Sequence, residues 1–420
     1  MRRFLLLLTL LPGLCLGQTA DSIVLLRPAR VFDGERLHEN WQVLVSGQRI
    51  AAAGPNLRVA AGTRTVDLPD CTLLPGLIEG HSHLLLHPYD EVPWNDQVLR
   101  ESHAERVARA VVHARKTLEA GFTTVRDLGT EGADYDDVGL KQAIEKGVVP
   151  GPRMLTAGRA LVATGSYGPK GFQPDVNVPQ GAEEADGTDR LTRAVRTQIG
   201  KGIDVVKVYA DYRWGLMGES KPTFLQSELE LVVQLATSAG RPVVAHATTA
   251  EGMRRATLAG CRTIEHGDGG TAEVFNLMKT RNVALCPTLA ATEATSQYRG
   301  WCKGNDPEPE RVSQKKRSFR LALEVGVTIC MGGDAGVFAH GDNARELELM
   351  VDYGMKPDEA LRAATATNAD VFGLADRLGR IRPGLLADVL VVEGNPVQTI
   401  TAIRRVRLVL KGGMIVFKKP

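Results

Sequence analysis

Two histidines separated by one residue, His81 and His83, follow an apolar run that extends from Cys71 to Ile78. Residues two apart on a strand point to the same face. Two imidazoles at this spacing can therefore bind one metal ion from the same side. A His-x-His pair is a weak indication by itself, and it becomes informative only when further ligands lie at matching places in the chain.

Four more polar residues lie in or directly after other strand-like apolar runs. They are Lys207 in Asp204–Tyr209, His246 after Val243–Ala245, His266 after Thr263–Glu265 and Asp334 after Met331–Gly333. The carboxyl ends of the strands of a (β/α)₈ barrel meet at one mouth, so we expect the six side chains to converge. Each histidine alone also fits a buried structural role, and Asp334 fits an ordinary turn. That alternative must hold at six places in one chain, so we favour a shared metal site.

The elements that must position these residues alternate between strand and helix patterns. The predicted strands are Thr72–Ile78, Thr123–Arg126, Arg153–Ala157, Ile203–Val208, Pro242–Ala245, Arg262–Ile264, Val283–Cys286 and Val327–Met331. The predicted helices are Glu101–Ala120, Gln226–Ala239, Thr271–Thr280, Ser313–Val325 and Lys356–Ala366. This alternation predicts an α/β fold, a (β/α)₈ TIM-like barrel. A doubly wound sheet is the alternative, but no Gly-x-Gly-x-x-Gly follows the first strand.

Short alternating strands mark both ends of the chain, in residues 22–70 and 385–419. Neither segment is long enough to bury a core alone, so we expect the two to form one small β-sandwich. The predicted domains are a signal peptide at 1–17, a β-sandwich from 18–75 plus 380–420, and a barrel from 76–379.

The first 17 residues have the pattern of a secretory signal peptide. Arg2 and Arg3 precede an apolar run that is too short to span a bilayer, and small residues stand before a cut at Gln18. We therefore expect export to the periplasm or secretion. A lipoprotein anchored at Cys15 is an alternative, although Leu14 stands where a small residue is usual. A buried N-terminal helix is another alternative.

The composition is that of a globular protein, with 420 residues of which 43% are hydrophobic and 24% charged. Lysine and arginine total 51 against 49 acidic residues, and no basic stripe stands out, so nucleic acid is not an expected partner. No membrane association is expected after signal cleavage. Cys71, Cys286 and Cys330 lie in apolar runs and are expected in the core, and the absence of Cys-x-x-Cys argues against a thiolate zinc site.

The metal-ligand pattern resembles the binuclear form of the amidohydrolase superfamily, and the resemblance covers nearly all of the mature chain. Other matching segments are Thr123–Gly129, Leu155–Leu161, Lys207–Asp211, Gly379–Val392 and Asn395-Pro396. The chain is most similar to the imidazolonepropionase-like branch, which includes Xaa-Pro and Xaa-Arg dipeptidases and ochratoxin A amidohydrolases.

The resemblance implies two divalent metal ions, with zinc expected and manganese, cobalt or iron as alternatives. His81, His83 and Asp334 would hold one ion, and His246 and His266 the other. Lys207 would bridge them as N6-carboxylysine, since burial lowers the pKa of a lysine and a neutral amine can add CO₂. Asp334 would act as general base and then as general acid.

Substrate-binding candidates lie beyond two of the strands. The dipeptidase branch has a histidine in the loop after strand 3, where this chain has Tyr167, and a tyrosine can hydrogen-bond a substrate carboxylate. Tyr209, Arg213 and Trp214 follow Lys207 and are further candidates. We expect the long loop 163–188 to lie at the mouth of the barrel and to have a functional role. A disordered insertion is the alternative.

The predicted function is hydrolysis of an amide next to a C-terminal amino acid, in a dipeptide or an N-acyl amino acid. Dipeptidase or carboxypeptidase activity and conversion of ochratoxin A to ochratoxin alpha plus phenylalanine both fit. A cyclic-amide hydrolase of the imidazolonepropionase type and a non-catalytic scaffold of the same fold are the alternatives. The expected partner is a small-molecule substrate, and the family implies a homo-oligomer.

Overall fold

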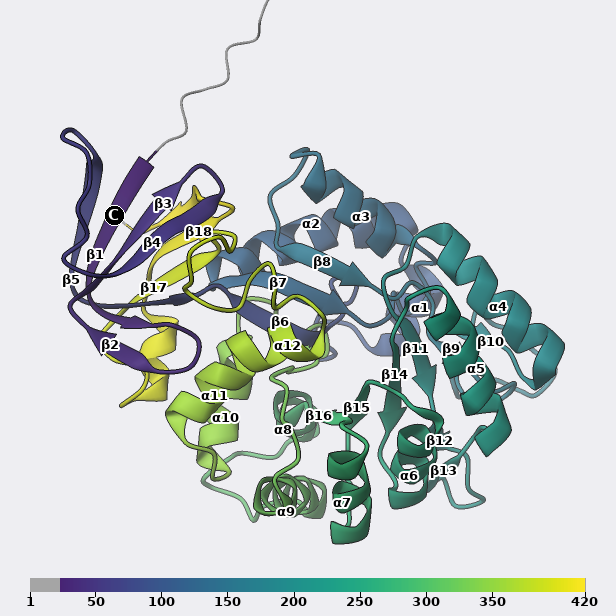
Figure 1. The fold of residues 1–420 in the computed structure, drawn as a ribbon. Coiled ribbons are helices and arrows are strands. Elements are labelled where there is room, and N and C mark those ends of the chain that lie inside the picture. The colour runs from purple at the N-terminus through teal and green to yellow at the C-terminus, as the bar shows by residue number, and fades with distance from the viewer. Residues whose placement is uncertain (1–22, 420) are drawn as a thin grey trace, which may run out of the picture.

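The computed structural model describes residues 23–419, so the predicted signal peptide and Cys15 lie outside the described residues. Figure 1 shows a β-rich part, purple and yellow, beside a ring of strands and helices. Among the described residues no helix is both long and apolar enough to cross a membrane.

Eight strand segments form the ring. They are β6 (Leu77–Ser82), β7 (Phe122–Asp127), β8 (Arg153–Thr156), β11 (Val206–Tyr209), β14 (Val243–Ala247), β15 (Thr263–His266), β16 (Ala284–Cys286) and a last segment reduced to a bridge at Ile329. Parallel pairs join β6, β7 and β8, and also β11, β14, β15 and β16. Backbone bonds from Asp204 and Val205 to Thr156 connect β8 with β11, and a Ser82–Ala335 bridge returns the chain to β6. The chain therefore forms a TIM-like barrel, as predicted.

The first barrel strand lies elsewhere than predicted. The apolar run predicts it at Thr72–Ile78, but the backbone divides at Gly76, where β5 (Arg64–Pro75) ends in the outer sheet and β6 begins. A Cβ at Gly76 would lie 2.1 Å from Oγ1 of Thr123, so the close passage there needs glycine. Every residue from position 71 to 80 is buried, so hydropathy does not reveal the division.

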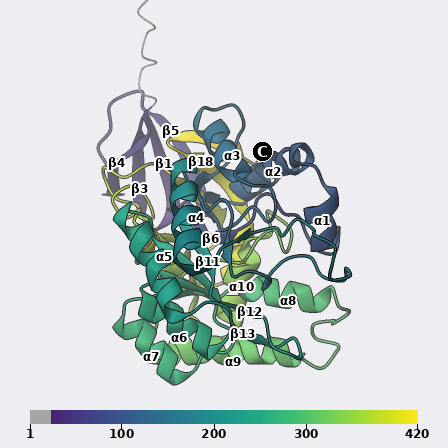
Figure 2. The same cartoon turned by 90° about the vertical axis from the view of Figure 1, so that its right-hand side faces the viewer.

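Helices cover the outside of the strands. They are α1 (Trp94–Arg100), α2 (His103–Glu119), α3 (Asp136–Glu145), α4 (Gly187–Lys201), α5 (Gln226–Ser238), α6 (Ala250–Ala259), α7 (Ala272–Thr280), α8 (Leu289–Gln297), α9 (Glu310–Val325), α10 (Ala344–Asp352), α11 (Pro357–Arg362) and α12 (Asn368–Val371). Figure 2 shows α4, α5, α6 and α7 following one another around the strands. Helix α2 buries Ala110, Ala114 and Leu118 at the spacing of one helical face, and Ser102 caps its start by accepting the amide hydrogen of Glu105.

The β-rich part is one eight-stranded sheet to which both ends of the chain contribute. Its order is β19-β18-β17-β5-β1-β3-β4, with β2 on β1. The remaining bounds are β1 (Ile23–Phe32), β2 (Leu37–Glu39), β3 (Trp41–Ser46), β4 (Arg49–Pro55), β17 (Val389–Glu393), β18 (Val406–Lys411) and β19 (Met414–Lys418). Alternate residues such as Val43 and Val45 are buried, as on one face of a strand. The sandwich arrangement and the domain boundaries stay predictions.

Shorter elements follow two of the barrel strands and connect other parts of the chain. The strands β9 (Leu161–Val162) and β10 (Glu183–Glu184) pair with each other near the two ends of the long loop, and β12 (Asp211–Arg213) forms a hairpin with β13 (Ser220–Pro222). Helix α11 continues into a π-helical turn (Ala363–Thr367), and a 3₁₀ turn (Ile400–Arg404) precedes β18.

Candidate active site

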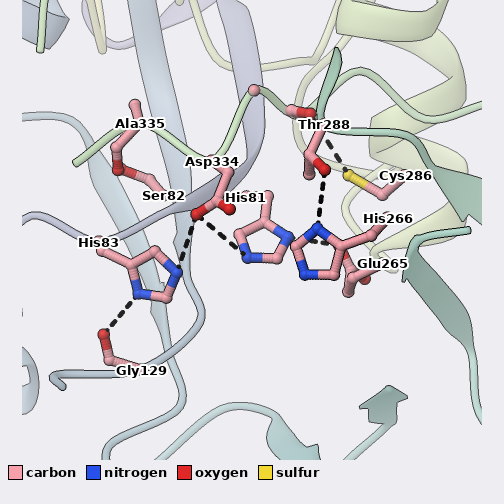
Figure 3. A network of polar contacts seen from close by, with 12 residues as sticks. His81, Ser82, His83, Gly129, Glu265, His266, Cys286, Thr288, Asp334 and Ala335 are labelled. Atoms are coloured by element: carbon pink, nitrogen blue, oxygen red, sulfur yellow. Dashed lines mark hydrogen bonds and ion pairs between the residues drawn. The ribbon is translucent and has the colours of Figure 1, made fainter. Parts of the chain in front are cut away.

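His81 and His83 lie at the end of β6, and each ring is held in place through its Nδ1 atom. Nδ1 of His81 lies 2.8 Å from Oε2 of Glu265, and Nδ1 of His83 lies 2.7 Å from the carbonyl oxygen of Gly129 (Figure 3). Both acceptors require the hydrogen on Nδ1, so each Nε2 is left with a free lone pair. These Nε2 atoms lie 3.7 Å and 3.1 Å from Oδ1 of Asp334.

Asp334 faces the histidines from the loop after the last barrel segment. Its φ is +66°, a left-handed conformation that aspartate tolerates better than most residues, and its amide donates to the carbonyl of His81. Burial alone would raise the pKa of Asp334. The adjacent imidazoles of His81 and His83 outweigh burial and lower the pKa to about 2. The carboxylate is therefore anionic at neutral pH and suited to a cation.

His246 and His266 complete a continuous group of rings. The centroid of His266 lies 4.4 Å from that of His246 and 5.1 Å from that of His81. Nδ1 of His266 lies 2.8 Å from Oγ1 of Thr288, and φ is +75° at His266 and +52° at Thr288. Burial, assisted by neighbouring positive charge, lowers the pKa of both histidines well below the usual value. Both rings are thus neutral, as metal ligands must be.

Lys207 lies among these groups on β11 with only 1% of its surface exposed. Its Nζ is buried and has no hydrogen-bond partner among residues 23–419, and burial lowers its pKa. Oδ1 of Asp334 is likewise buried without a well-formed hydrogen bond within that range. Unpaired buried polar atoms are rare in folded proteins. Two such atoms near the histidine rings fit a site for divalent cations.

The ligand atoms are close enough to share cations. His81, His266 and Asp334 each offer one ligand atom, and these atoms lie within 4.8 Å of one another. This group combines His266 with His81 and Asp334, although the family resemblance assigns His266 to one ion and the other two residues to the second ion. The structure therefore brings the six predicted metal ligands to one mouth, while their division between two ions stays a prediction.

Buried carboxylates behind the ligands were missed by sequence reasoning. Glu79 accepts the amide hydrogens of His81 and Gly333 and a side-chain hydrogen of Asn343. Glu265 also accepts from the guanidinium of Arg126, at 2.8 Å. A carboxylate inside an otherwise apolar strand, one or two residues before a ligand histidine, is the pattern that could have revealed them.

The substrate candidates divide into two groups. Tyr167 and Tyr209 are buried with ring centroids 4.9 Å apart, and Tyr209 stacks on His246 at 4.5 Å. Arg213 and Trp214 belong to the β12–β13 hairpin region, and the Trp214 side chain is 49% exposed. The structure thus places the tyrosines against the metal-ligand group and the other two at the outer surface.

The remaining histidines have local structural partners. His87 contacts Glu91 and Glu101, and His113 stacks on His340 at 4.3 Å. The predicted core cysteines are buried and unpaired. They are Cys71, Cys286 and Cys330.

The amidohydrolase family model matches residues 72–416, and the chain belongs to this family. It is 31% identical over 424 aligned residues to ochratoxinase from Aspergillus niger, covering 92% of this chain and 85% of the relative. A crystal structure of a Xaa-Pro dipeptidase with bound methionine in the active site superposes with a TM-score of 0.83 and 31% identity, over 95% of this chain and all of that one. The crystal structure of A. niger ochratoxinase gives 0.81 and 28%, over 95% and 96%.

An imidazolonepropionase from Cutibacterium acnes is a more distant relative, 22% identical over 374 residues, or 84% of this chain and 83% of the relative. Taken together, these relationships identify the chain as a hydrolase that acts on carbon–nitrogen bonds. Members of the family use divalent metals, which agrees with the ligand groups described above.

Proposed function

We propose that this protein is a binuclear metal-dependent amidohydrolase that cleaves an amide next to a C-terminal amino acid. The observation that carries the proposal is the buried Lys207 amine, which lies without a hydrogen-bond partner among the described residues and beside the His81–Asp334 group. Addition of CO₂ to this amine, with loss of a proton, would form a carbamate whose two oxygens could serve as ligands for divalent cations. Both the dipeptidase and the ochratoxinase similarities support an amide substrate.

Each residue of the site has a proposed role. His81, His83 and Asp334 would hold one ion, His246 and His266 the second, and carboxylated Lys207 would lie between them. When bound, the two ions supply hydroxide at neutral pH and polarise the scissile carbonyl. Asp334 would take the proton of the attacking water on a carboxylate oxygen and deliver it to the leaving nitrogen as the carbon–nitrogen bond breaks.

Zinc is the proposed metal, since imidazole and carboxylate oxygen are its usual ligands in hydrolytic sites. We further propose export through residues 1–17, and a homo-oligomeric assembly. The β-rich part is proposed as a small sandwich built from residues 18–75 and 380–420. The proposed substrate-contacting residues remain Tyr167, Tyr209, Arg213 and Trp214.

The test combines elemental analysis with a screen for released amino acids. Zinc-loaded protein is expected to hold about two ions per chain and to release phenylalanine or another amino acid from dipeptides or N-acyl amino acids. Lys207→Ala should lose both the second ion and turnover. Less than one ion per chain after careful loading would instead favour the non-catalytic scaffold, and a ring-opened acid without a free amine would favour a cyclic-amide hydrolase.

A further inference from the structure

Glu131 is a buried carboxylate near the proposed metal-ligand group, and the proposed mechanism gives it no role. Glu131 follows β7, and only 3% of its surface is exposed. Two residues before it, the carbonyl of Gly129 holds His83 in place. A Cβ built at Gly129 would lie 3.4 Å from Oε1 of Glu131 and 3.7 Å from Cε1 of His83. Oε1 of Glu131 and Cε1 of His83 therefore lie no more than about 7 Å apart, on either side of Gly129.

Three neutral donors from separate segments point at this carboxylate. Oε2 accepts from the indole nitrogen of Trp94 at 3.1 Å and from the hydroxyl of Tyr167 at 2.5 Å. Oε1 has a single long contact, 3.4 Å from the hydroxyl of Tyr209. A carboxylate oxygen accepts about two hydrogen bonds, so Oε1 retains capacity for a stronger donor.

The backbone of Glu131 is fixed independently of its side chain. The buried guanidinium of Arg106 donates to the carbonyl oxygens of Glu131, Thr130 and Leu85. This clamp holds Glu131 at a φ of +49°. Arg106 thus contacts the peptide groups rather than the carboxylate, and within residues 23–419 no cationic side chain forms an ion pair with the carboxylate oxygens.

The surroundings of Glu131 are aromatic. Tyr167 lies 5.3 Å from Trp94, 4.9 Å from Tyr209 and 4.8 Å from Tyr212, measured between ring centroids. Aromatic faces attract cations, and a buried carboxylate without a cationic partner is costly to maintain. The hydroxyl hydrogen of Tyr167 is committed to Glu131, so this tyrosine offers lone pairs rather than a donor. That arrangement disfavours the substrate carboxylate that the sequence suggested as the partner of Tyr167.

We propose that Glu131, with the rings of Trp94, Tyr167 and Tyr209, is a specificity subsite for a cationic nitrogen of the substrate. The inference rests on the proposed amidohydrolase function and deepens it by naming the class of substrate. An ammonium group would donate to Oε1 and lie against the tyrosine rings. Two parts of a dipeptide carry such a group: the N-terminal amine, or the end of a basic side chain.

Two matched pairs of substrates separate these sources. L-alanyl-L-phenylalanine and propionyl-L-phenylalanine differ only in the N-terminal amine. L-alanyl-L-lysine and L-alanyl-L-norleucine differ only in the side-chain amine. For zinc-loaded full-length protein we expect kcat/KM to favour the charged member of one pair by about tenfold or more, as for a hydrogen bond to a charged group. Glu131→Gln should bring that ratio close to one.

A control variant tests for indirect effects. Tyr212→Phe removes a hydroxyl from a neighbouring ring and should leave the ratio unchanged. Tyr167→Phe removes a hydrogen bond that positions Glu131 and should lower the ratio, whereas a role in binding the substrate carboxylate would raise KM equally for every substrate. Equal rates within both pairs for the wild-type protein, or a preference that Glu131→Gln leaves intact, would overturn the inference.

An error in the proposed function would give a result that differs from an error in the proposed subsite. If none of the four compounds is hydrolysed, the amidohydrolase proposal fails, and the same compounds then serve as stable ligands in calorimetry. Tighter binding of the charged member of a pair, lost in Glu131→Gln, would still support the subsite. Equal binding within both pairs would refute it.

Discussion

The imidazole of His81 and the carboxylate of Glu265 form a buried contact, with 2.8 Å between Nδ1 and Oε2. Glu265 is held in turn by Arg126, so the carboxylate orients the ring and presents Nε2 to Asp334. The negative charge persists despite burial, because Arg126 and His81 lower the pKa of Glu265. Glu265 thus positions a proposed metal ligand.

Glu265→Gln should weaken metal retention while leaving the fold intact. The amide has one acceptor oxygen for two donors, so it cannot hold both His81 and Arg126 as the carboxylate does. Loss of such a partner costs about 10–100-fold in metal affinity. Competition with a chromogenic chelator measures the change, and Glu273→Gln, on the exposed start of α7, is the matched control. Equal metal affinity in the two variants would show that Glu265 has no such role.

The ion pair between Arg153 and Asp388 should be important for stability. Arg153 of β8 donates two hydrogen bonds to Asp388, at 2.8 Å and 3.0 Å, and links the barrel to the β-rich part. The Asp388 side chain is 2% exposed and that of Arg153 is 27% exposed, so Asp388→Asn leaves a partly buried guanidinium without its anionic partner and should cost about 3 kcal/mol of unfolding free energy. Denaturant unfolding measures this cost.

An exposed pair of the same geometry supplies the comparison. Arg27 and Asp67 also form two hydrogen bonds, but their side chains are 47% and 64% exposed. Asp67→Asn should leave the unfolding midpoint unchanged, because solvent screens such pairs. Similar losses for both variants would contradict the importance assigned to burial.

Stability should rise with pH above about 8 because of Lys411. Burial, with the positive charge of Arg153, lowers the pKa of Lys411 to about 8. A lysine in the unfolded chain titrates near 10.4, as an exposed lysine does. Between these values the unfolded chain binds the proton and the folded protein has lost it, so the unfolding free energy increases with pH.

Lys411→Met should remove this increase and stabilise the protein most below pH 8, where the wild type buries a charged amine. The measurement is the difference in unfolding midpoint between variant and wild type at pH 7, 8, 9 and 10. Lys418→Met, on the exposed end of β19, is the control. A difference that stays constant with pH would exclude Lys411 as the source.

Thiol labelling should report one reactive cysteine in the described part of the chain. Cys302 is exposed, whereas Cys71, Cys261, Cys286 and Cys330 are buried. Burial raises the pKa of Cys261 and Cys330 to about 12, which further suppresses their reaction as thiolates. Mass spectrometry after brief alkylation should find the label on Cys302, and Cys302→Ser should remove it. Rapid labelling of Cys286 would indicate an opening beneath the proposed metal site.

The positions of the proposed metal ligands at strand ends could be predicted from the sequence, because strand ends are visible in hydropathy. His246 and His266 each end an apolar run, and parallel strands bring such ends together. The division at Gly76 could not be predicted in this way, since burial continues through it.

The surroundings of Glu131 could not be predicted from the sequence for a different reason. Its partners, Trp94, Tyr167 and Tyr209, come from separate segments, and no periodicity links them. The same holds for Arg153 and Asp388, which are 235 residues apart. Contacts of this kind depend on the path of loops, which sequence patterns constrain weakly.

The position of β5 between β1 and β17 has a consequence for how the chain folds during its synthesis. Leu73 pairs with Val31 on one side and with Val391 on the other, so the sheet cannot be completed until synthesis has reached the last tenth of the polypeptide. Until then one edge of β5 is left without its neighbour and is open to intermolecular pairing. Truncation before β17 should therefore produce aggregation rather than an independently folded barrel.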